Sequence, residues 1–262
     1  MKISIVMAYY NRRKHLYNTL CTIEKADFKD FEVIIVDDGS DDTEKVNDYN
    51  DQFEFDIKVI ELKKEDRQFH MNPCVVYNRG FKEATGEIIM IQNPECLHMG
   101  DVLTFTAGNL KTEEYYSYGC YSIDRPSFVS IDKLDFKSDN VIKMITDIIT
   151  PMKNSCVHQD GQLGWYNHSE YRPKGYHFLS AIYKSELDAL GGFDERYTKS
   201  IGYDDDEILA RIKRKGMKVI IVNVMYCIHQ FHDHRVYIPG TRSNKELYLN
   251  TTLKETGWKA NK

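Results

Sequence analysis

Residues 86–101, GEIIMIQNPECLHMGD, contain the first residue types whose spacing suggests chemistry. The apolar run at residues 88–91 has the length of a buried strand, and the proline that follows cannot continue a central ladder. Ligands of open α/β sheets bind beyond the carboxyl ends of the strands. Glu95, with His98 close behind it, is therefore a candidate ligand for a metal or a phosphate. A plain strand-to-helix connection, with Asp101 capping the helix, explains the same residues.

A second stretch, LGGFDERYTKSIGYDDDEILARIKRKG, carries three adjacent carboxylates, Asp204, Asp205 and Asp206. They open residues 204–215, which have one apolar face, bases in the last turn and a glycine beyond it, as is typical of a helix. Helix capping alone explains acids at this place. However, capping needs one side chain, and adjacent carboxylates repel one another. We therefore expect at least one of the three to have a functional role.

A third stretch, residues 226–235 (YCIHQFHDHR), holds three of the nine histidines of the chain. If this segment is extended, His232 and His234 point to one side and His229 to the other. A lone histidine here would suggest a structural role, whereas a cluster that follows an acidic helix favours metal binding. A zinc site built from the histidines alone is one alternative.

The first hundred residues alternate short apolar runs with amphipathic segments, the pattern of alternating strands and helices. The predicted strands are residues 3–8, 31–36, 57–62 and 88–91. The predicted helices are residues 11–25, which Asn11 caps, a segment from about residue 42, and residues 72–84. This alternation predicts an α/β fold, with a mostly parallel sheet and right-handed crossovers.

The carboxyl ends of the first, second and fourth strands meet at one edge of such a sheet. They carry Tyr-Tyr-Asn at residues 9–11, Asp-Asp at residues 37–38 and Asn-Pro-Glu at residues 93–95. An aromatic ring can stack on a base, one carboxylate can accept from a ring N–H, and another can hold a divalent metal against a diphosphate. The alternative is that VDDGS is only a turn. The chain has neither a glycine-rich dinucleotide fingerprint nor a P-loop.

The second half of the chain is less regular. Its predicted helices are residues 102–110, 139–149 and 245–253, and its predicted strands are residues 115–122 and 218–222. Residues 150–174 form a long irregular segment, which is usually functional or mobile in a compact domain. Trp165 in this segment suits stacking on a sugar, and a structural loop around buried aromatic side chains is equally consistent.

Composition limits the possible classes of protein. The net charge of −5 argues against broad nucleic-acid binding, which needs a basic surface. The six cysteines show no C-x-x-C pair, so we expect small buried apolar side chains in a reducing compartment, with no disulfide framework and no zinc site. No apolar run approaches the roughly 20 residues that span a bilayer. We therefore expect no transmembrane segment and a cytoplasmic protein.

Three blocks in the first part of the chain, ISIVMAYYNR, FEVIIVDDGSDD and NRGFKEATGEIIMIQNPE, resemble the nucleotide-binding half of glycosyltransferase family 2 in order and spacing. The resemblance implies a GT-A fold, one continuous domain with a Rossmann-like nucleotide-sugar-binding half at residues 1–110 and an acceptor-binding, catalytic half at residues 111–262. The donor-binding residues that it implies are Ala8 and Tyr10 beside the nucleobase, Asn11 at the same strand end, Asp38 on the uracil, and Asn78 in the helix that closes the diphosphate region.

The chain departs from the family at the metal-binding motif. Family members usually carry Asp-x-Asp after the fourth strand, where this chain has Asn93, Pro94 and Glu95. Glu95 stands at the second acidic position and can bind Mn²⁺ or Mg²⁺, while Asn93 offers a neutral carbonyl on the donor side. The resemblance therefore implies a weaker metal site, and a member that has lost activity is the alternative.

The acidic stretch resembles the acceptor-side motif of galactosyl- and N-acetylgalactosaminyl-transferases, a G-G-x-D-E segment followed by an acidic triplet that opens a helix. The match implies that Asp205 is the general base and that Asp204 and Asp206 orient the acceptor, to which we add Trp165. It also implies that Gly191 and Gly192 let the backbone approach the donor sugar. Related enzymes complete the metal site with a histidine at the third stretch, and here His229 is our first choice and His232 the second.

Together these observations predict an inverting, metal-dependent glycosyltransferase. It would move a hexose or an N-acetylhexosamine from a UDP-sugar to a saccharide or glycan acceptor. A nucleotidyltransferase also uses strand-end carboxylates and a metal, but it needs neither the acidic helix nor the histidines. A non-catalytic glycan- or nucleotide-binding module is the third possibility.

Overall fold

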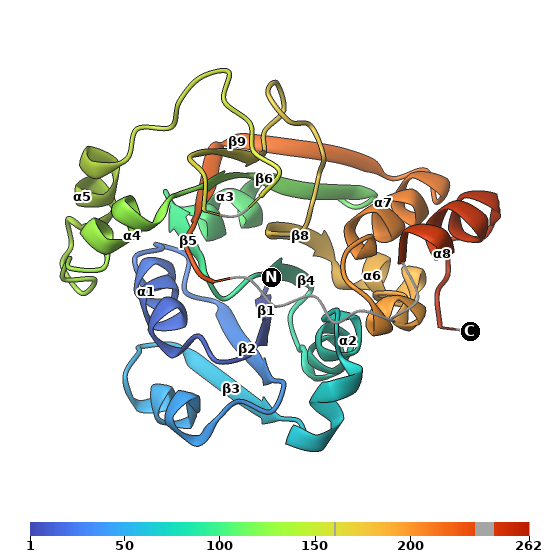
Figure 1. The fold of residues 1–262 in the computed structure, drawn as a ribbon, viewed down its shortest axis with the longest axis horizontal. Coiled ribbons are helices and arrows are strands. Elements are labelled where there is room, and N and C mark those ends of the chain that lie inside the picture. Colours follow the sequence, from blue (N-terminus) through green and yellow to red (C-terminus); the bar gives the residue numbers. More distant parts are fainter. Residues whose placement is uncertain (160, 234–243, 262) are drawn as a thin grey trace.

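The computed structural model describes residues 1–159, 161–233 and 244–261. One curled, mostly parallel sheet runs through the molecule, and helices lie on both of its faces (Figure 1). The strand order is β3-β2-β1-β4-β8-β6-β9-β5, and β7 pairs with β6. The strands are β1 (Ile3–Tyr9), β2 (Phe31–Asp37), β3 (Asp56–Glu61), β4 (Ile88–Gln92), β5 (Cys96–Met99), β6 (Glu114–Ser122), β7 (Gly164–Asn167), β8 (Leu179–Tyr183) and β9 (Lys218–His229).

The helices connect these strands or cover the sheet. They are α1 (Arg13–Glu24), α2 (Cys74–Glu83), α3 (Val102–Asn109), α4 (Arg125–Ile131), α5 (Val141–Ile148), α6 (Lys184–Leu190), α7 (Asp204–Arg214) and α8 (Asn244–Asn250). No helix among the described residues combines the length and the apolar character that crossing a membrane requires.

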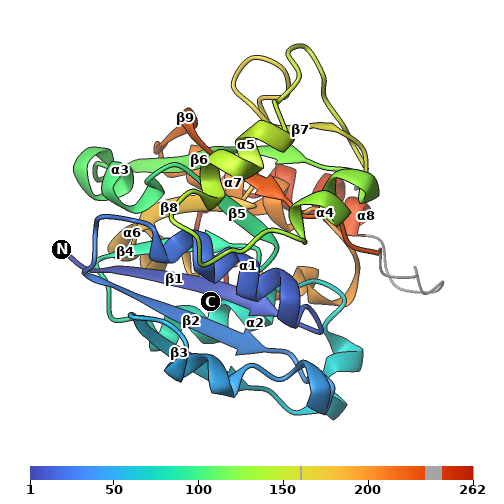
Figure 2. The same cartoon turned by 90° about the vertical axis from the view of Figure 1, so that its left-hand side faces the viewer.

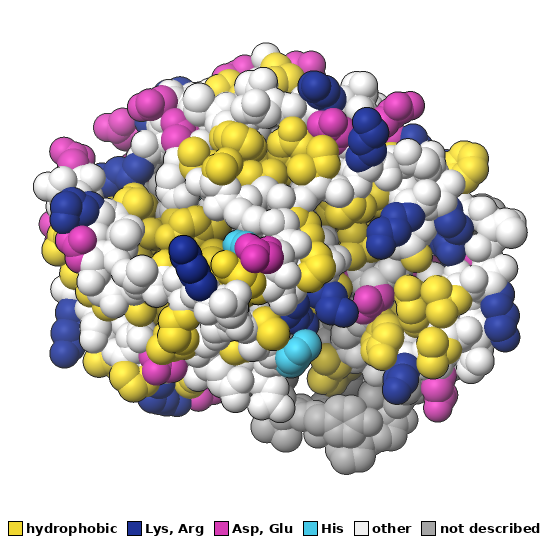
Figure 3. Space-filling model, turned by 90° about the horizontal axis from the view of Figure 1, so that it is seen from above, with side chains coloured by type: hydrophobic (Ala, Val, Ile, Leu, Met, Phe, Trp, Pro, Cys, Tyr) yellow, Lys and Arg dark blue, Asp and Glu magenta, His cyan; other side chains and the backbone are white. Residues whose placement is uncertain are grey.

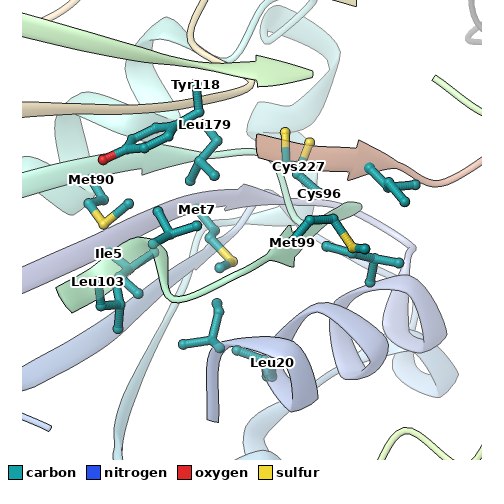
Figure 4. Packing of buried hydrophobic residues seen from close by; sticks show 14 of the residues in the cluster. Ile5, Met7, Leu20, Met90, Cys96, Met99, Leu103, Tyr118, Leu179 and Cys227 are labelled. Carbon is teal, nitrogen blue, oxygen red and sulfur yellow. The ribbon is translucent and has the colours of Figure 1, made fainter. Parts of the chain in front are cut away.

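Successive residues of β1 pack on the two faces of the sheet, as the pleat demands. Ile5 and Met7 share one core with Leu20 of α1, whereas Val6 belongs to a second core with Val76 of α2. Figure 4 shows the first core, with side chains from several strands above α1. Figure 2 shows β1, β2 and β3 side by side at one end of the sheet, with α1 in front of β1. The two cores hold the strands in a fixed register and therefore fix where each strand ends.

The parallel part of the sheet confirms the predicted meeting of strand ends. β1 pairs in parallel with both β2 and β4, so that Tyr9 is opposite Asp37, and Met7 is opposite Gln92. The strands predicted at residues 3–8, 31–36, 57–62 and 88–91 are all present. The segments that follow β1, β2 and β4 therefore leave the sheet at the same edge.

Two predictions in the first part of the chain are wrong. The helix expected from about residue 42 is replaced by short 3₁₀ turns at Asp42–Glu44 and Asn47–Asp51, because Asp and Asn side chains compete with helix hydrogen bonds. Asn11 does not cap α1, whose N-cap is Arg12. Instead, Asn11 takes a left-handed conformation with a φ of 46°. Its side chain is therefore free to bind the loop that follows β2.

Other predictions are confirmed, and several elements were not predicted. Asp101 does cap α3, accepting a hydrogen bond from the Thr104 N–H. The segment after Glu95 is strand β5, which pairs antiparallel with β9, so Asn-Pro-Glu is a turn between two strands. β9 extends to His229, well beyond the expected residues 218–222. The unpredicted β8 lies antiparallel to both β4 and β6 and joins the two halves of the sheet.

Helix α7 is anchored by a buried ion pair. Arg211 and Glu207 are 2% and 0% exposed, and their guanidinium and carboxylate groups form two hydrogen bonds. Arg211 also donates to the carbonyls of Leu190 and Gly192 at 2.8 and 2.9 Å. These bonds tie α7 to the segment that follows α6, and so they fix the first turn of α7, with its three aspartates, against the sheet.

Replacing Arg211 with leucine is expected to lower the free energy of unfolding by about 3–5 kcal/mol, because it leaves Glu207 buried without its counter-ion. Urea unfolding followed by circular dichroism measures this value. The matched control is Lys213→Leu on the exposed side of the same helix, which is expected to change the free energy by less than about 0.5 kcal/mol. Equal effects of the two substitutions would contradict the anchoring role of Arg211.

Candidate active site

A cleft of about 450 Å³ lies where the segments after β1, β2 and β4 meet the first turn of α7. It contains groups from both halves of the chain. The residues predicted from the sequence that line it are Ala8, Tyr10, Asn11, Asp38, Asn93, Glu95, Asp204 and Asp205. The sheet and α7 therefore bring together side chains that are far apart in the sequence.

Asp38 forms the buried end of the cleft. Its side chain is 5% exposed, and its carboxylate lies 2.5 Å from His70 Nδ1 and 3.2 Å from Arg67 Nη1. The Arg67 guanidinium also lies over the ring of Tyr10, 4.1 Å from its centroid. Arg67 and His70 belong to the polar loop after β3 and were not predicted as site residues. The only signal for Arg67 and His70 in the sequence is that two basic side chains follow the end of a strand.

Asn11 fixes the ends of β1 and β2 relative to each other. Its side-chain amide donates to Asp41 Oδ2 at 2.8 Å, and its oxygen accepts from the Asp41 N–H at 2.9 Å. Its own N–H donates to Ser40 Oγ at 3.0 Å. Asparagine is one of the few residues that adopt a left-handed conformation readily. The contacts of Asn11 therefore hold the segments after β1 and β2 together beside the cleft.

Glu95, His229 and His232 form a cluster beside the cleft that can hold a metal ion. Glu95 Oε1 lies 3.3 Å from His229 Nε2 and 3.6 Å from His232 Nε2. The three ligand atoms lie within 4.8 Å of one another. One carboxylate oxygen and two imidazole nitrogens are a donor set that suits Mn²⁺. The residues therefore fit a divalent metal ion in both distance and chemistry.

Arg12 lies on the other side of Glu95 and was not predicted as a site residue. Its Nη1 is 2.8 Å from Glu95 Oε2, and the Glu95 side chain is 4% exposed. Burial alone raises the pKa of Glu95, but Arg12, His229 and His232 outweigh burial and hold that pKa well below its ordinary value. Glu95 is therefore ionised at neutral pH, as a metal ligand must be.

The structure corrects the prediction that His229 and His232 point to opposite sides. β9 ends at His229, so the alternation of an extended strand does not reach His232, and both rings meet Glu95. Asn93 lies in the cleft, but its Oδ1 accepts from the Tyr77 hydroxyl at 3.1 Å. His234 lies outside the described residues.

His98 is not part of the site, although the sequence places it just behind Glu95. It is 1% exposed and lies within β5, where its Nε2 is 3.0 Å from Gln92 Oε1. Burial lowers the pKa of His98 to about 3, so the ring is neutral. His98 is therefore a buried structural histidine with its own hydrogen-bond partner.

The first turn of α7 forms the opposite wall of the cleft. Asp204 accepts a hydrogen bond from Asn72 at 2.8 Å, and burial together with the charge of Asp205 raises the pKa of Asp204. Tyr203, directly before this turn, takes a left-handed φ of 65°. Such backbone strain costs about 1–3 kcal/mol and is found mostly at functional sites. The side chain of Asp205 remains 22% exposed, on the cleft.

Asn78 and Gly192 do not line the cleft, although both were predicted to lie at the donor. Asn78 accepts from the Phe193 N–H and donates to the Phe193 carbonyl, both at 2.8 Å. Gly192 has a φ of +70°, and a Cβ atom on it would lie 2.3 Å from Asn78 Oδ1. A Cβ atom on Gly191 would likewise meet the Ala260 carbonyl oxygen, at 2.5 Å. These residues hold α2 and the chain terminus against the segment that carries the two glycines.

Two of the residues predicted to bind the acceptor are also absent from the cleft lining. Trp165 is 6% exposed in β7, and its Nε1 donates to the Met152 carbonyl at 3.2 Å. Because β7 pairs with β6, it buries Trp165 against Tyr121 in the core. The second is Asp206, whose Oδ1 accepts a hydrogen bond from the Tyr176 hydroxyl at 3.5 Å.

Cysteine usage follows the prediction in part. Five of the six cysteines are buried and Cys156 is exposed, and none of the six forms a disulfide bond. Cys96, Cys120 and Cys227 are completely buried and offer sulfur atoms within 4.8 Å of one another, a grouping that the scattered sequence positions do not reveal. Figure 4 shows Cys96 and Cys227 beside each other in the core. They lie among apolar side chains and are not among the residues that line the cleft.

The comparison with protein families agrees with this architecture. Residues 4–162 match the model described as glycosyl transferase family 2, and residues 166–234 match the model described as the N-terminal domain of galactosyltransferase. The first match covers more than half of the chain. The chain therefore belongs to glycosyltransferase family 2.

Similar proteins include two that are named for a sugar-transfer or polysaccharide-synthesis activity and one uncharacterized glycosyltransferase. Chondroitin synthase of Escherichia coli is 28% identical over 247 residues, which is 87% of this chain and 34% of that protein. Dolichol-phosphate mannosyltransferase of Pyrococcus furiosus is 30% identical over 106 residues, 39% of this chain and 28% of that protein. The uncharacterized glycosyltransferase YfnE of Bacillus subtilis is 22% identical, over 88% of this chain and 65% of that protein. The chain thus spans less than two thirds of the length of each of these relatives.

Solved structures share the fold. Mannosyltransferase PcManGT from Pyrobaculum calidifontis, in complex with GDP-Man and Mn²⁺, superposes with a TM-score of 0.56 at 19% identity, over 90% of this chain and 58% of that one. TarS 1-349 from S. aureus in complex with UDP gives 0.55 at 16% identity, over 95% and 63%. The complex of TarS with UDP-GlcNAc gives 0.54 at 15% identity, over 91% and 62%. The fold of this chain is therefore GT-A.

Proposed function

We propose that the chain is an inverting, metal-assisted glycosyltransferase that moves a hexose or an N-acetylhexosamine from a UDP-sugar to a saccharide or glycan acceptor. The observation that carries this proposal is the single cleft that joins Asp38, Glu95 and Asp205. Chemically, these positions correspond to a base-binding carboxylate, a metal ligand and a general base. Complexes of TarS with UDP and UDP-GlcNAc, and the name of the chondroitin synthase, support a UDP-sugar and a glycan acceptor.

In this proposal residues 1–110 bind the nucleotide sugar. Asp38 accepts the N3–H of uracil, and the ring of Tyr10 borders the base. Ala8 lines the cleft at the end of β1 without a bulky side chain. Arg67 and His70 hold the Asp38 carboxylate in place through contacts of 3.2 and 2.5 Å.

Glu95, His229 and His232 are the residues that hold Mn²⁺, or Mg²⁺ in its place. When bound, the ion neutralises charge on the departing diphosphate. Arg12 adds a fixed positive charge at Glu95 and is available to a phosphate oxygen. Asn93 contributes a neutral oxygen to the same wall, so the net negative charge there is lower than in a site with two aspartates.

Residues 111–262 bind the acceptor and carry the base. Asp205 takes the proton of the acceptor hydroxyl, and Asp204, which also lines the cleft, orients the acceptor. The hydroxyl oxygen forms a bond to the anomeric carbon while the bond from that carbon to the diphosphate breaks, and UDP leaves with the electron pair. A single displacement from the opposite face inverts the anomeric configuration.

Product analysis tests this proposal. The protein with Mn²⁺ is incubated with UDP-galactose, UDP-GlcNAc or UDP-GalNAc and a panel of monosaccharide and oligosaccharide acceptors. Phosphorus NMR is expected to show UDP as the nucleotide product, and proton coupling constants to show a β-linked sugar from an α-linked donor. Pyrophosphate as the product would instead indicate a nucleotidyltransferase. Binding of UDP without any turnover, including donor hydrolysis, would indicate a non-catalytic binding module.

A further inference from the structure

His177 is a buried histidine two residues before β8, and it lies in the wall of the cleft. It is 6% exposed. Its ring contacts Tyr77 of α2 edge-on, with centroids 5.5 Å apart, and Phe193 at 4.9 Å. Aromatic packing on two sides therefore fixes the orientation of the imidazole.

The polar contacts of His177 converge on the acidic helix turn. The backbone N–H of His177 donates to Asp205 Oδ1 at 2.8 Å, and its ring Nδ1 lies 2.6 Å from the same oxygen. The ring Nε2 lies 3.8 Å from Asp204 Oδ2. Among the described residues, the hydrogen bonds and ion pairs of Asp205 all end on Oδ1, so Oδ2 is left for another partner.

We propose that His177 is a positioning residue, which holds Oδ1 of Asp205 so that Oδ2 is presented to the acceptor hydroxyl. The inference rests on the proposed role of Asp205 as the general base. A carboxylate on the first turn of a helix can rotate about its side-chain bonds. One oxygen of Asp205 accepts a hydrogen bond from the backbone N–H of His177 and lies in ion-pair distance of its ring. Because His177 is itself packed in place, these two contacts restrict that rotation and pre-orient the base before the acceptor binds.

Charge adds to this positioning. Burial lowers the pKa of His177, but Asp205 and Asp204 outweigh burial and raise it above its ordinary value. The pairing of imidazolium with carboxylate is therefore complete below the ordinary pKa and is lost as the pH rises through the raised pKa.

Other titratable groups also face this pair. Asp206 belongs to the same helix turn and faces Tyr176, Lys174 and Arg172. Burial raises the pKa values of Tyr77 and Tyr115, so these two tyrosines stay neutral at physiological pH. Neutral tyrosines do not offset the negative charge of the aspartates. The positive charge of His177 is therefore the charge in direct contact that stabilises the Asp205 carboxylate.

Two substitutions at one position separate positioning from packing. His177→Asn keeps an N–H donor where Nδ1 lies, whereas His177→Leu keeps the apolar volume and removes the donor. We expect His177→Leu to lower kcat about 100-fold, while its KM for the donor sugar stays within about threefold of the value for the unmodified protein. We expect His177→Asn to retain most of the kcat of the unmodified protein. Because a nearby cation favours the carboxylate, the acidic limb of the kcat profile is expected to move to higher pH in His177→Leu.

A spectroscopic titration provides a readout that needs no acceptor. The imidazole of His177 is identified in histidine-labelled protein by the signal that His177→Asn lacks, and its titration is followed by NMR. The midpoint is expected above the ordinary value of 6.5 in the unmodified protein and lower in Asp205→Asn. Asp188→Asn on exposed α6 is expected to leave it unchanged.

The possible outcomes separate the positioning role of His177 from the proposed transferase function. An unchanged kcat and pH profile in His177→Leu, or a His177 midpoint that does not respond to Asp205→Asn, would overturn the positioning role. Equal losses in both His177 variants, together with lowered melting temperatures, would show a purely structural histidine. If the unmodified protein transfers no sugar while the NMR coupling is present, the proposed function fails independently of the pairing.

Discussion

Asp205→Asn is expected to reduce sugar transfer by about 10²–10⁴-fold while the affinity for UDP stays the same. General-base catalysis by a positioned side chain contributes a factor of this size, and an amide cannot accept the acceptor proton. Asp205 belongs to α7 and is not among the described ion-pair partners of Asp38 or Glu95, so we expect UDP binding not to depend on its charge. Steady-state kinetics of UDP release, together with calorimetric titration of UDP, measure the two quantities.

The matched control for this substitution is Asp188→Asn. Asp188 is a largely exposed partner of Lys184 on α6, with a side-chain exposure of 57%. Its replacement is expected to leave both kcat and UDP affinity unchanged. An Asp205→Asn variant that retains more than about a tenth of the normal kcat would show that another group removes the proton.

Glu95→Gln is expected to abolish the response of the protein to Mn²⁺. The substitution keeps the shape of the side chain but removes the charge that pairs with Arg12, His229 and His232. It leaves Arg12 beside two imidazoles with no carboxylate to attract a cation, so electrostatic repulsion opposes metal binding. We expect Mn²⁺ affinity to fall by at least about 100-fold, a change that electron paramagnetic resonance of free Mn²⁺ measures directly.

Glu246→Gln, on the exposed face of α8, is the control for that titration. It makes the same chemical change on an exposed carboxylate that is not one of the candidate ligands, and it is expected to leave Mn²⁺ binding intact. Normal Mn²⁺ affinity in Glu95→Gln would mean that the metal binds elsewhere. The group His177, Asp204 and Asp205, whose ligand atoms also lie within 4.8 Å of one another, would then be the next candidate.

Surface charge is consistent with a small anionic ligand in a local site. On the face shown in Figure 3, basic and acidic side chains are interspersed with apolar patches. The positive charge around the cleft comes instead from individual partly buried residues, Arg12 at Glu95 and Arg67 at Asp38. Such local charges can bind a nucleotide sugar while the net charge of the chain is −5.

The parts of the fold that could be predicted are those that local pattern controls. The parallel strands β1, β2 and β4 are continuous apolar runs, and α7 carries acids at its start and bases at its end. β8 has the short sequence LSAIY, which has no pattern strong enough to separate it from a loop. It forms because β4 and β6 lie on either side of it.

The same distinction applies to the site. Asp38, Glu95 and Asp205 stand directly after strands or at a helix start, where position in the sequence predicts position in space. Arg12 and His177 act on these acids from other segments, so only the folded chain shows the pairing. For Trp165 the sequence predicted a site residue where the structure has a buried one. An aromatic residue in an irregular segment has the same sequence pattern whether it contacts a sugar or packs in the core.

The most direct test of metal-dependent UDP binding is calorimetric titration of UDP into the protein, first with Mn²⁺ and then with EDTA. The cleft geometry predicts saturable binding with Mn²⁺ and a loss of at least about tenfold in affinity with EDTA, because the diphosphate then has no ion at Glu95 to neutralise it. Equally tight binding in EDTA would show that Glu95 and the histidines do not act through a metal. No binding of UDP under either condition would contradict the assignment of the donor site itself.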